Sequence, residues 1–231
     1  MDESQKKSRR AIKSTAPFYT RKQLLAETVP LVLFLVMTGI AFVSHPLLPE
    51  KIPIHWNAAG AVDNYGSRDL VFLLPGVFLV LLLLLFFFPL MEPFRKNMQD
   101  NYWRYYFFKV IFSIFFVVLF FVTLLPNFGY RINIASVIIT MVALLFIGIG
   151  IAMRNIKQNY MFGIRTPWTL ASELSWTKTH RLGSVLFTLL GILMIIGVFL
   201  LKPELLFILF LVALGSVIIA LFAYSYVIYR K

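Results

Sequence analysis

The sequence predicts an all-α membrane protein with six transmembrane helices and both termini in the cytoplasm. Composition indicates the class, because 60% of the 231 residues are hydrophobic and 14% are charged, against about 45–50% and about 25% in soluble domains. The apolar residues lie in runs of roughly 20, the length that a helix needs to cross about 30 Å of hydrocarbon. The distribution of Lys and Arg between these runs indicates the orientation.

Six apolar runs are long enough to be membrane spans. A β-barrel would alternate apolar and polar residues at every second position, and runs such as FLVLLLLLFFFPL do not alternate, so we expect helices. Only Lys202 and Pro203 separate the last two runs, which predicts a tight antiparallel helical hairpin with Pro203 in the first turn of its second helix. The expected spans are Leu24–Ser44, Leu70–Leu90, Tyr105–Leu125, Ile134–Met153, Ser184–Leu201 and Glu204–Ile228.

The chain divides into three parts. Residues 1–23 form a basic tail without the features of a secretory signal peptide, so the first apolar run is expected to stay in the membrane. Residues 24–91 hold the first helical hairpin with the loop between its two spans, and residues 92–231 hold the other four spans. The chain has no cysteine, which excludes disulfides and thiol chemistry.

Positive charge is concentrated on one side of the expected membrane. All 22 Lys and Arg residues except Lys51, Arg68, Arg131 and Lys202 fall in the two tails or in or beside the second and fourth loops. Cytoplasmic loops keep Lys and Arg, so we expect the termini and these two loops in the cytoplasm. Anionic lipid headgroups then account for the formal charge of +12, and direct binding to nucleic acid is not expected.

The first loop, residues 45–69, is therefore expected outside the cell as a structured loop. A short extended run over Ile52–Trp56 precedes a turn-rich segment over Asn57–Gly66. The polar and aromatic side chains of this loop suit the binding of a peptide or another external ligand. The alternative, which the residue types favour, is that they only anchor the loop at the membrane surface. These side chains are His55, Trp56, Asn57, Asp63, Asn64 and Tyr65.

The three histidines are expected on opposite sides of the membrane. His45 and His55 belong to the first loop and His180 belongs to the fourth. One metal site cannot use all three, so we expect no metal ion and no other cofactor.

The fourth loop, residues 154–183, is a polar, aromatic-rich insert. Thr166 and Pro167 form a helix-start signature, so we expect an amphipathic cytoplasmic helix from there toward Arg181. Side chains at i, i+4 spacing share one face of it, which is either a docking surface or, as the periodicity favours, an interfacial anchor. Arg165 offers five donors to a carboxylate or phosphate. The shared face carries Trp168, Ser172, Trp176 and His180.

Two segments resemble known families. The fourth loop reads NYMFGIRTPWTL from Asn159 to Leu170, with Trp176 and His180 farther on, and it resembles the signature of the SdpI/YfhL family of bacterial membrane proteins. The first loop is similar, over residues 48–66, to a small domain of unknown function that often forms the N-terminal part of that family. Together with the six spans, the resemblance covers nearly the whole chain except the basic tail, so residues 92–231 are expected to be an SdpI-like membrane region.

The resemblance implies immunity, because the family is named for a protein that protects bacterial producers of a secreted toxic peptide and also holds a transcriptional repressor at the membrane. We therefore expect a multi-pass cell-membrane protein that gives resistance to a secreted antimicrobial peptide and relays a signal to a cytoplasmic transcriptional regulator. The expected partners are membrane lipids, the peptide and the regulator. The resemblance assigns ligand or partner binding to Asn159, Gly163, Arg165, Thr166, Pro167, Trp168, Thr169, Trp176 and His180 inside, and to His55 and Asn57 outside, where Pro53, Gly60 and Gly66 also match.

A small-molecule transporter and a membrane lipid-modifying enzyme remain as alternatives. Glu27 and Lys109 lie about one turn from the cytoplasmic ends of their spans, so we expect them to reach water, and the alternative is that they pair with each other. No acidic residue lies near the middle of a span, so an ion-coupled transporter lacks its usual carboxylate. An enzyme would act through Arg165, Glu173 and His180, but no nucleophile–base pair supports it, and we expect no enzymatic activity.

Overall fold

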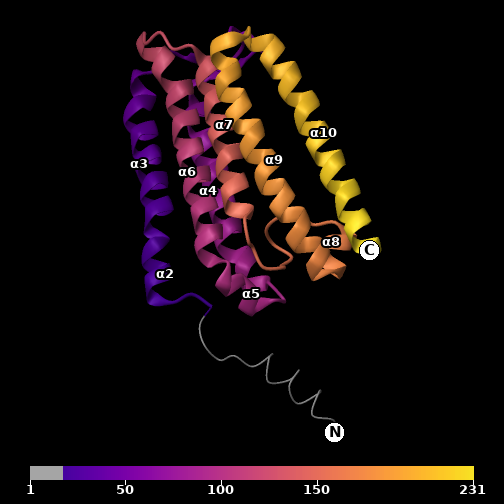
Figure 1. Cartoon of the computed structure of the whole chain (residues 1–231). Coiled ribbons are helices and arrows are strands. Elements are labelled where there is room, and N and C mark those ends of the chain that lie inside the picture. The colour runs from indigo at the N-terminus through magenta and orange to yellow at the C-terminus, as the bar shows by residue number, and fades with distance from the viewer. Residues whose placement is uncertain (1–17) are drawn as a thin grey trace.

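The computed structural model describes residues 18–231 and shows one bundle of long helices (Figure 1). Most of the predicted basic tail, residues 1–17, lies outside the described residues. The longer elements are α2 (Arg21–Ala26), α3 (Thr28–Ser44), β1 (Lys51–Trp56), β2 (Val62–Ser67), α4 (Leu73–Phe87), α5 (Arg95–Asp100), α6 (Tyr102–Leu124), α7 (Ile134–Met153), α8 (Pro167–Ala171), α9 (Glu173–Leu200) and α10 (Pro203–Arg230). Short 3-10 helices are η1 (His45–Leu47), η2 (Arg68–Phe72), η3 (Phe88–Met91) and η4 (Leu125–Phe128).

The six predicted spans are confirmed. Within the described part of the chain, six helices are long and apolar enough to cross a membrane, and each predicted run falls inside one of them to within one residue. The helix α9 ends at Leu200 and α10 begins at Pro203, so the tight hairpin is confirmed too. The chain is a multi-pass membrane protein.

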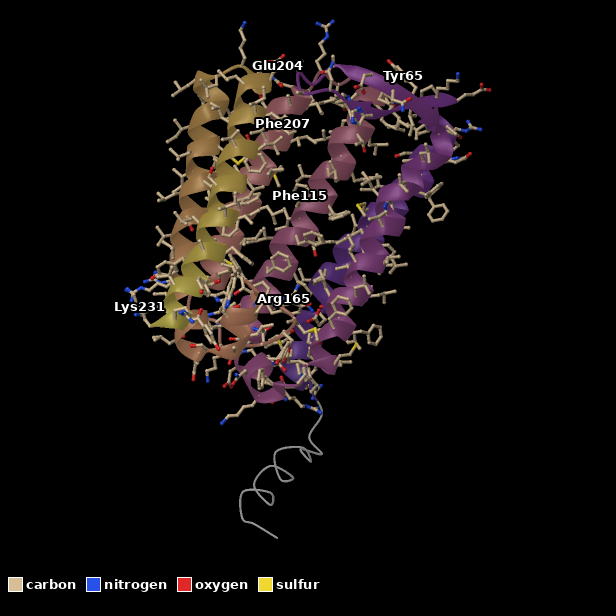
Figure 2. The ribbon with its side chains drawn as sticks, turned by 90° about the vertical axis from the view of Figure 1, so that its right-hand side faces the viewer. Tyr65, Phe115, Arg165, Glu204, Phe207 and Lys231 are labelled. Carbon is tan, nitrogen blue, oxygen red and sulfur yellow. The ribbon has the colours of Figure 1, made fainter. Side chains whose placement is uncertain are left out.

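The bundle has two structurally different ends. One end holds the start of α2, the end of α10 and the short helices α5 and α8, and we call it the loop end (Figure 1). The other holds β1 and β2, and we call it the hairpin end; Tyr65 marks it in Figure 2. Which side of the membrane each end faces stays a prediction from the charge distribution.

The helices α7 and α9 form the most extensive helix pair, and small residues allow their close approach. A Cβ at Gly150 would meet the carbonyl oxygen of Ser184, and a Cβ at Gly191 would meet that of Ala143 and the side chain of Ile147. Lipid tails are as apolar as the helix surfaces, so membrane helices associate largely through such close backbone packing.

The first loop folds into a two-stranded antiparallel hairpin. Lys51 pairs with Ser67 and Trp56 pairs with Val62, with an irregularity near His55. The extended run predicted over Ile52–Trp56 therefore corresponds to β1.

The prediction of a turn-rich segment over Asn57–Gly66 is wrong in its second half, where β2 lies. The turn itself takes up only residues 57–61, and the Asn57 side chain accepts hydrogen bonds from the backbone N–H groups of Ala59 and Ala61 at 3.0 Å. No residue of β2 is fully buried, so the strand lacks the apolar alternation by which strands are predicted.

An ion pair joins the first and third spans. Lys109 is 1% exposed, and its Nζ donates to the Glu27 carboxylate at 2.5 Å. Tyr102 donates to the same oxygen at 3.0 Å, and the Tyr105 ring lies 5.2 Å from the Lys109 ammonium. The expectation that Lys109 reaches water is wrong, and the alternative, pairing with Glu27, is confirmed. The physical reason is that α3 and α6 pack together here and enclose the charge.

Gly191→Ala is expected to destabilise the fold by about 1–3 kcal/mol, because the new methyl group meets the backbone of α7 and not a flexible side-chain end. Gly215→Ala in α10 is the matched control, since nothing lies within 4 Å of a Cβ there. Thermal unfolding in detergent, followed by the helical circular dichroism signal, measures both. Equal melting temperatures for the two variants would contradict the close contact of α7 and α9.

Glu27→Leu is expected to cost about 3–5 kcal/mol, because it leaves the buried Lys109 ammonium unpaired. The double variant Glu27→Leu/Lys109→Met removes both charges and should recover most of this loss. Asp100→Asn is the control, since it breaks an exposed pair with Lys157 and should cost less than about 1 kcal/mol. Chemical unfolding in detergent compares the four proteins, and a double variant no more stable than Glu27→Leu would argue against the pair.

Candidate functional site

Residues 154–166, which we call the signature segment, lie at the loop end between α7 and α8, where Figure 2 labels Arg165. From Arg154 to Thr166 it contains no helix or strand. Its backbone N–H and C=O groups therefore need partners from elsewhere in the molecule, and at the edge of a membrane each missing partner is costly. Side chains of residues 92–101 supply several of these partners.

Asn101 binds the first part of the segment. Its side chain is fully buried, donates to the carbonyl oxygen of Lys157 at 2.8 Å and accepts from the N–H of Lys157 at 2.8 Å. Asn97 donates to the carbonyl oxygen of Gln158 at 2.9 Å. These side-chain amide groups supply the backbone hydrogen bonds that a neighbouring β-strand would supply in a sheet.

Glu92 binds the middle of the segment. Its carboxylate is buried and accepts hydrogen bonds from the backbone N–H groups of Tyr160 at 2.8 Å and Phe94 at 2.9 Å. Two N–H donors offset much of the cost of burying a carboxylate.

Sequence reasoning missed Glu92, Asn97 and Asn101. They lie more than fifty residues before the segment that they bind, and in the sequence they look like ordinary polar residues of a cytoplasmic loop. The presence of two asparagines beside a membrane span is the one signal that could have drawn attention to them, because Asn carries both a donor and an acceptor.

The Asn159 side chain forms hydrogen bonds with the backbone of its own segment. Its side chain is fully buried, accepts from the N–H groups of Met161 at 3.0 Å and Phe162 at 2.7 Å, and donates to the carbonyl oxygen of Lys157 at 2.9 Å. Only a short amide side chain offers both functions at this reach. The observed role of Asn159 is to shape the loop.

His180 and Trp176 stack on α9 with 4.0 Å between their ring centroids, and both are buried. His180 Nδ1 lies 2.8 Å from the carbonyl oxygen of Trp176, and Nε2 accepts from the N–H of Ile164 at 2.8 Å. A carbonyl only accepts and a backbone N–H only donates, so the imidazole is neutral with its proton on Nδ1. Trp176 donates to the carbonyl oxygen of Ile156 at 2.8 Å.

Gly163 lets the loop pass over this ring pair. Its φ is +116°, and a Cβ there would meet His180 Nε2 and the side chain of Ile156. Both the backbone conformation and the close approach require glycine.

Thr166 and Thr169 start the helix α8 as a capping box, with Pro167 in the first turn. The predicted helix start is therefore confirmed. The hydroxyl groups of Thr166 and Ser225 form a hydrogen bond of 3.0 Å, which links this turn to α10.

The prediction of one amphipathic helix from Thr166 toward Arg181 is wrong. The helix α8 has five residues, and Ser172 then interrupts it and caps α9, which begins at Glu173 and continues into the membrane. The backbone of Ser172 is extended, so the side chains of α8 and α9 do not continue one helical face. An N-cap is a common role for Ser, but the sequence pattern does not tell a cap from a residue inside a helix.

The shared face expected on that helix forms only in part, because Trp176 and His180 stack on α9 whereas Trp168 and Ser172 lie outside that helix. Trp168 packs against α10, with 4.8 Å between its ring centroid and that of Phe222, whereas Trp176 faces the loop. Trp176 is 0% exposed, so the interpretation of this residue as a headgroup anchor is wrong.

Arg165 is the charged residue of the signature, and it is exposed. One of its guanidinium nitrogens donates to the carbonyl oxygen of Tyr160, and within residues 18–231 it forms no ion pair. Its other donors remain for a carboxylate or phosphate from outside the molecule. Lys178 and Arg181 on α9 are exposed as well, so this end presents positive charge.

A cavity of about 610 Å³ lies at the hairpin end. Strand β1 and the turn after it cover the cavity, α4, α6 and α7 form its walls, and Phe207 of α10, labelled in Figure 2, lies at its side. Its volume is typical of ligand sites, which run from about 300 to about 1,000 Å³. Most lining side chains are apolar, and the polar or amphipathic ones are His55, Trp56, Asn57, Thr123 and Asn127.

Trp56 lines this cavity and carries an unsatisfied donor. Its indole Nε1 is buried and has no hydrogen-bond partner within the described residues. The two predicted outer candidates have partners: His55 Nδ1 bonds with Asp63 at 2.5 Å, and Asn57 shapes the turn. The cavity could not be found from the outer loop alone, because three of its walls come from membrane helices.

The predicted site residues thus form two groups at opposite ends of the bundle. The nine signature residues gather at the loop end, and His55 and Asn57 lie at the hairpin end. Both ring nitrogens of His180 are occupied, so it is not free to act as a general base. Within residues 18–231, no three His, Asp or Glu side chains lie close enough to hold a metal ion.

Two segments of the chain match known protein families. Residues 155–225 match the SdpI/YfhL protein family, and residues 32–79 match a domain of unknown function, DUF1648. The chain is 29% identical to the immunity protein SdpI of Bacillus subtilis over 83% of this chain and 89% of that protein. No solved structure matches.

Trp176→Phe is expected to loosen the signature segment by about 1–3 kcal/mol, because it leaves the buried carbonyl oxygen of Ile156 without its donor. Trp168→Phe is the control, since it keeps the ring packed against α10 and the Trp168 indole forms no hydrogen bond within residues 18–231. Amide hydrogen exchange over residues 154–165 measures the change. Exchange that is equally fast in both variants would show that the Trp176 hydrogen bond does not hold the loop.

Proposed function

We propose that this chain, a member of the SdpI/YfhL family, is an immunity protein of the cell membrane that protects its cell against a secreted antimicrobial peptide. The alignment with the Bacillus subtilis immunity protein supports the proposal because it extends over most of both chains. It therefore includes the hairpin end as well as the signature, and a shared loop motif alone does not account for it.

The cavity beneath the β-hairpin is the observation that carries the proposal. The charge distribution favours an orientation with the hairpin end outside the cell, which is the side that a secreted peptide reaches first. A mostly apolar cavity with one unsatisfied donor at that end suits a membrane-active ligand.

The relay of a signal to a cytoplasmic regulator belongs to the same proposal. The helix α7 lines the cavity with its first turns and carries the signature segment at its other end, so one rigid element reaches both sites. Peptide binding would favour one arrangement of α7 and α9, and the regulator would recognise the exposed Arg165 and the partly exposed Trp168 in that arrangement. Because coupling is reciprocal, peptide binding that leaves the affinity for the regulator unchanged would reject the relay.

A small-molecule transporter is the second candidate. The cavity favours it, whereas the buried aromatic cluster that closes the loop end, formed by residues such as Tyr102, Tyr105 and Trp176, does not. A transporter would have to open this cluster during each cycle, whereas an immunity protein would not. Uptake of a substrate into proteoliposomes, together with no protection of cells, would favour transport.

Expression in a peptide-sensitive bacterium tests the proposed function. We expect wild type to raise survival over an empty vector, and Arg165→Ala and Trp168→Ala to lose protection by roughly tenfold, the factor that a charge-assisted contact supplies. Lys178→Ala, which removes an exposed cation outside the signature, is the control and should protect like wild type. Membrane levels are matched by immunoblot, and survival no better than the vector against every peptide tested would reject immunity.

A further inference from the structure

We infer that the cavity at the hairpin end is the receptor for apolar side chains of the secreted peptide, and that the Trp56 indole donates a hydrogen bond to a peptide carbonyl group. The inference rests on the proposed function, since it names the ligand of an immunity protein. It goes beyond that function by assigning the binding site and the chemistry of the bound part.

The cavity lies at the depth where a surface-bound peptide places its apolar side chains. Its walls reach Leu119 on α6 and Ile139 on α7, which lie five residues, or about 8 Å, from the ends of these helices at Leu124 and Ile134. An amphipathic helix on a membrane buries its apolar face roughly 5–10 Å deep. A peptide on the outer surface therefore reaches the cavity without crossing the membrane.

The cavity is also accessible. Leu70, Leu73 and Phe207 line it, and each of them is exposed as well. Side chains of a peptide lying in the outer leaflet can therefore enter between the hairpin and the membrane helices.

Trp56 favours a peptide over a lipid chain as the occupant. Its buried N–H lacks a partner within residues 18–231, and a buried tryptophan N–H usually has one. An acyl chain that fills an apolar cavity brings no acceptor. A peptide brings backbone carbonyl groups together with its apolar side chains, so it fills the cavity and, once the Trp56 ring turns to expose its buried Nε1, also satisfies the donor.

The absence of cysteine from the chain allows a direct test in proteoliposomes of the full-length protein. Ile138→Cys places one thiol in the cavity wall, and Tyr130→Cys places one in the exposed loop before α7, outside the cavity. The probe is a synthetic amphipathic helix made of leucine and lysine. We expect it to slow alkylation by N-ethylmaleimide roughly tenfold at position 138, as a bound ligand does well above its Kd, and to leave position 130 unchanged.

Further variants in the Ile138→Cys background separate cavity binding from adsorption to the membrane. Leu119→Trp fills the cavity and should abolish the slowing, whereas Val212→Trp, on an exposed part of α10 outside the cavity, should not. Trp56→Phe keeps an aromatic ring at this position and removes the donor, so it should weaken peptide binding by roughly threefold to tenfold.

Two outcomes of the alkylation test would overturn the inference. Equal slowing at positions 138 and 130 would mean that the peptide only covers the membrane surface. Alkylation at position 138 that is slow in phospholipid, fast in lipid-free detergent and unaffected by the peptide would mean that a lipid fills the cavity.

The survival assay separates this inference from the proposed function. If wild type and Leu119→Trp protect cells equally, the cavity is not the receptor and immunity still stands. If wild type protects against no peptide, the proposed function fails, and the inference fails with it even where the synthetic peptide still slows alkylation at position 138.

Discussion

The loop end depends on one constraint, which is that an irregular segment at the edge of the membrane has to satisfy its backbone inside the protein. The segment after α7 meets this constraint with buried side chains from both directions of the chain. Asn101 and Glu92 bind it from before α6, and His180 and Trp176 bind it from α9. Most of the signature residues close a particular hydrogen bond or make room for one. Trp168 instead packs against α10, and the exposed Arg165 uses one donor for the Tyr160 carbonyl oxygen and, among the described residues, leaves the others free.

The two ends of the bundle differ in how completely their interiors are packed. The loop end is closed by aromatic rings and by polar side chains that have partners, and the Glu27–Lys109 pair adds a buried charge contact close to it. The hairpin end is closed only by a two-stranded hairpin and leaves an apolar cavity beneath it. A well-packed end resists change and an incompletely filled end can accept a ligand, which fits the proposal that the ligand binds at the hairpin end.

Prediction succeeded where a local pattern has one structural meaning. Runs of about 20 apolar residues can only be membrane helices, and Pro203 or Thr166–Pro167 can start a helix but cannot continue one. It failed where the meaning depends on a distant partner. The strand β2 follows no apolar alternation because none of its residues is fully buried, and Ser172 could belong to a helix or to its cap. Lys109 was expected to reach water, because the sequence does not show that α3 and α6 pack over it.

The sequence by itself determined the class of this protein, the number and approximate positions of its spans, and the likeness of two segments to known families. These follow from hydrophobicity and residue type, which act through the solvent and not through particular neighbours. Only the tertiary structure decided that most signature residues hold the loop, that the two candidate groups lie at opposite ends, and that Trp56 borders a cavity. Each of these depends on contacts between segments far apart in the chain. The local order of residues does not show which distant segments come into contact.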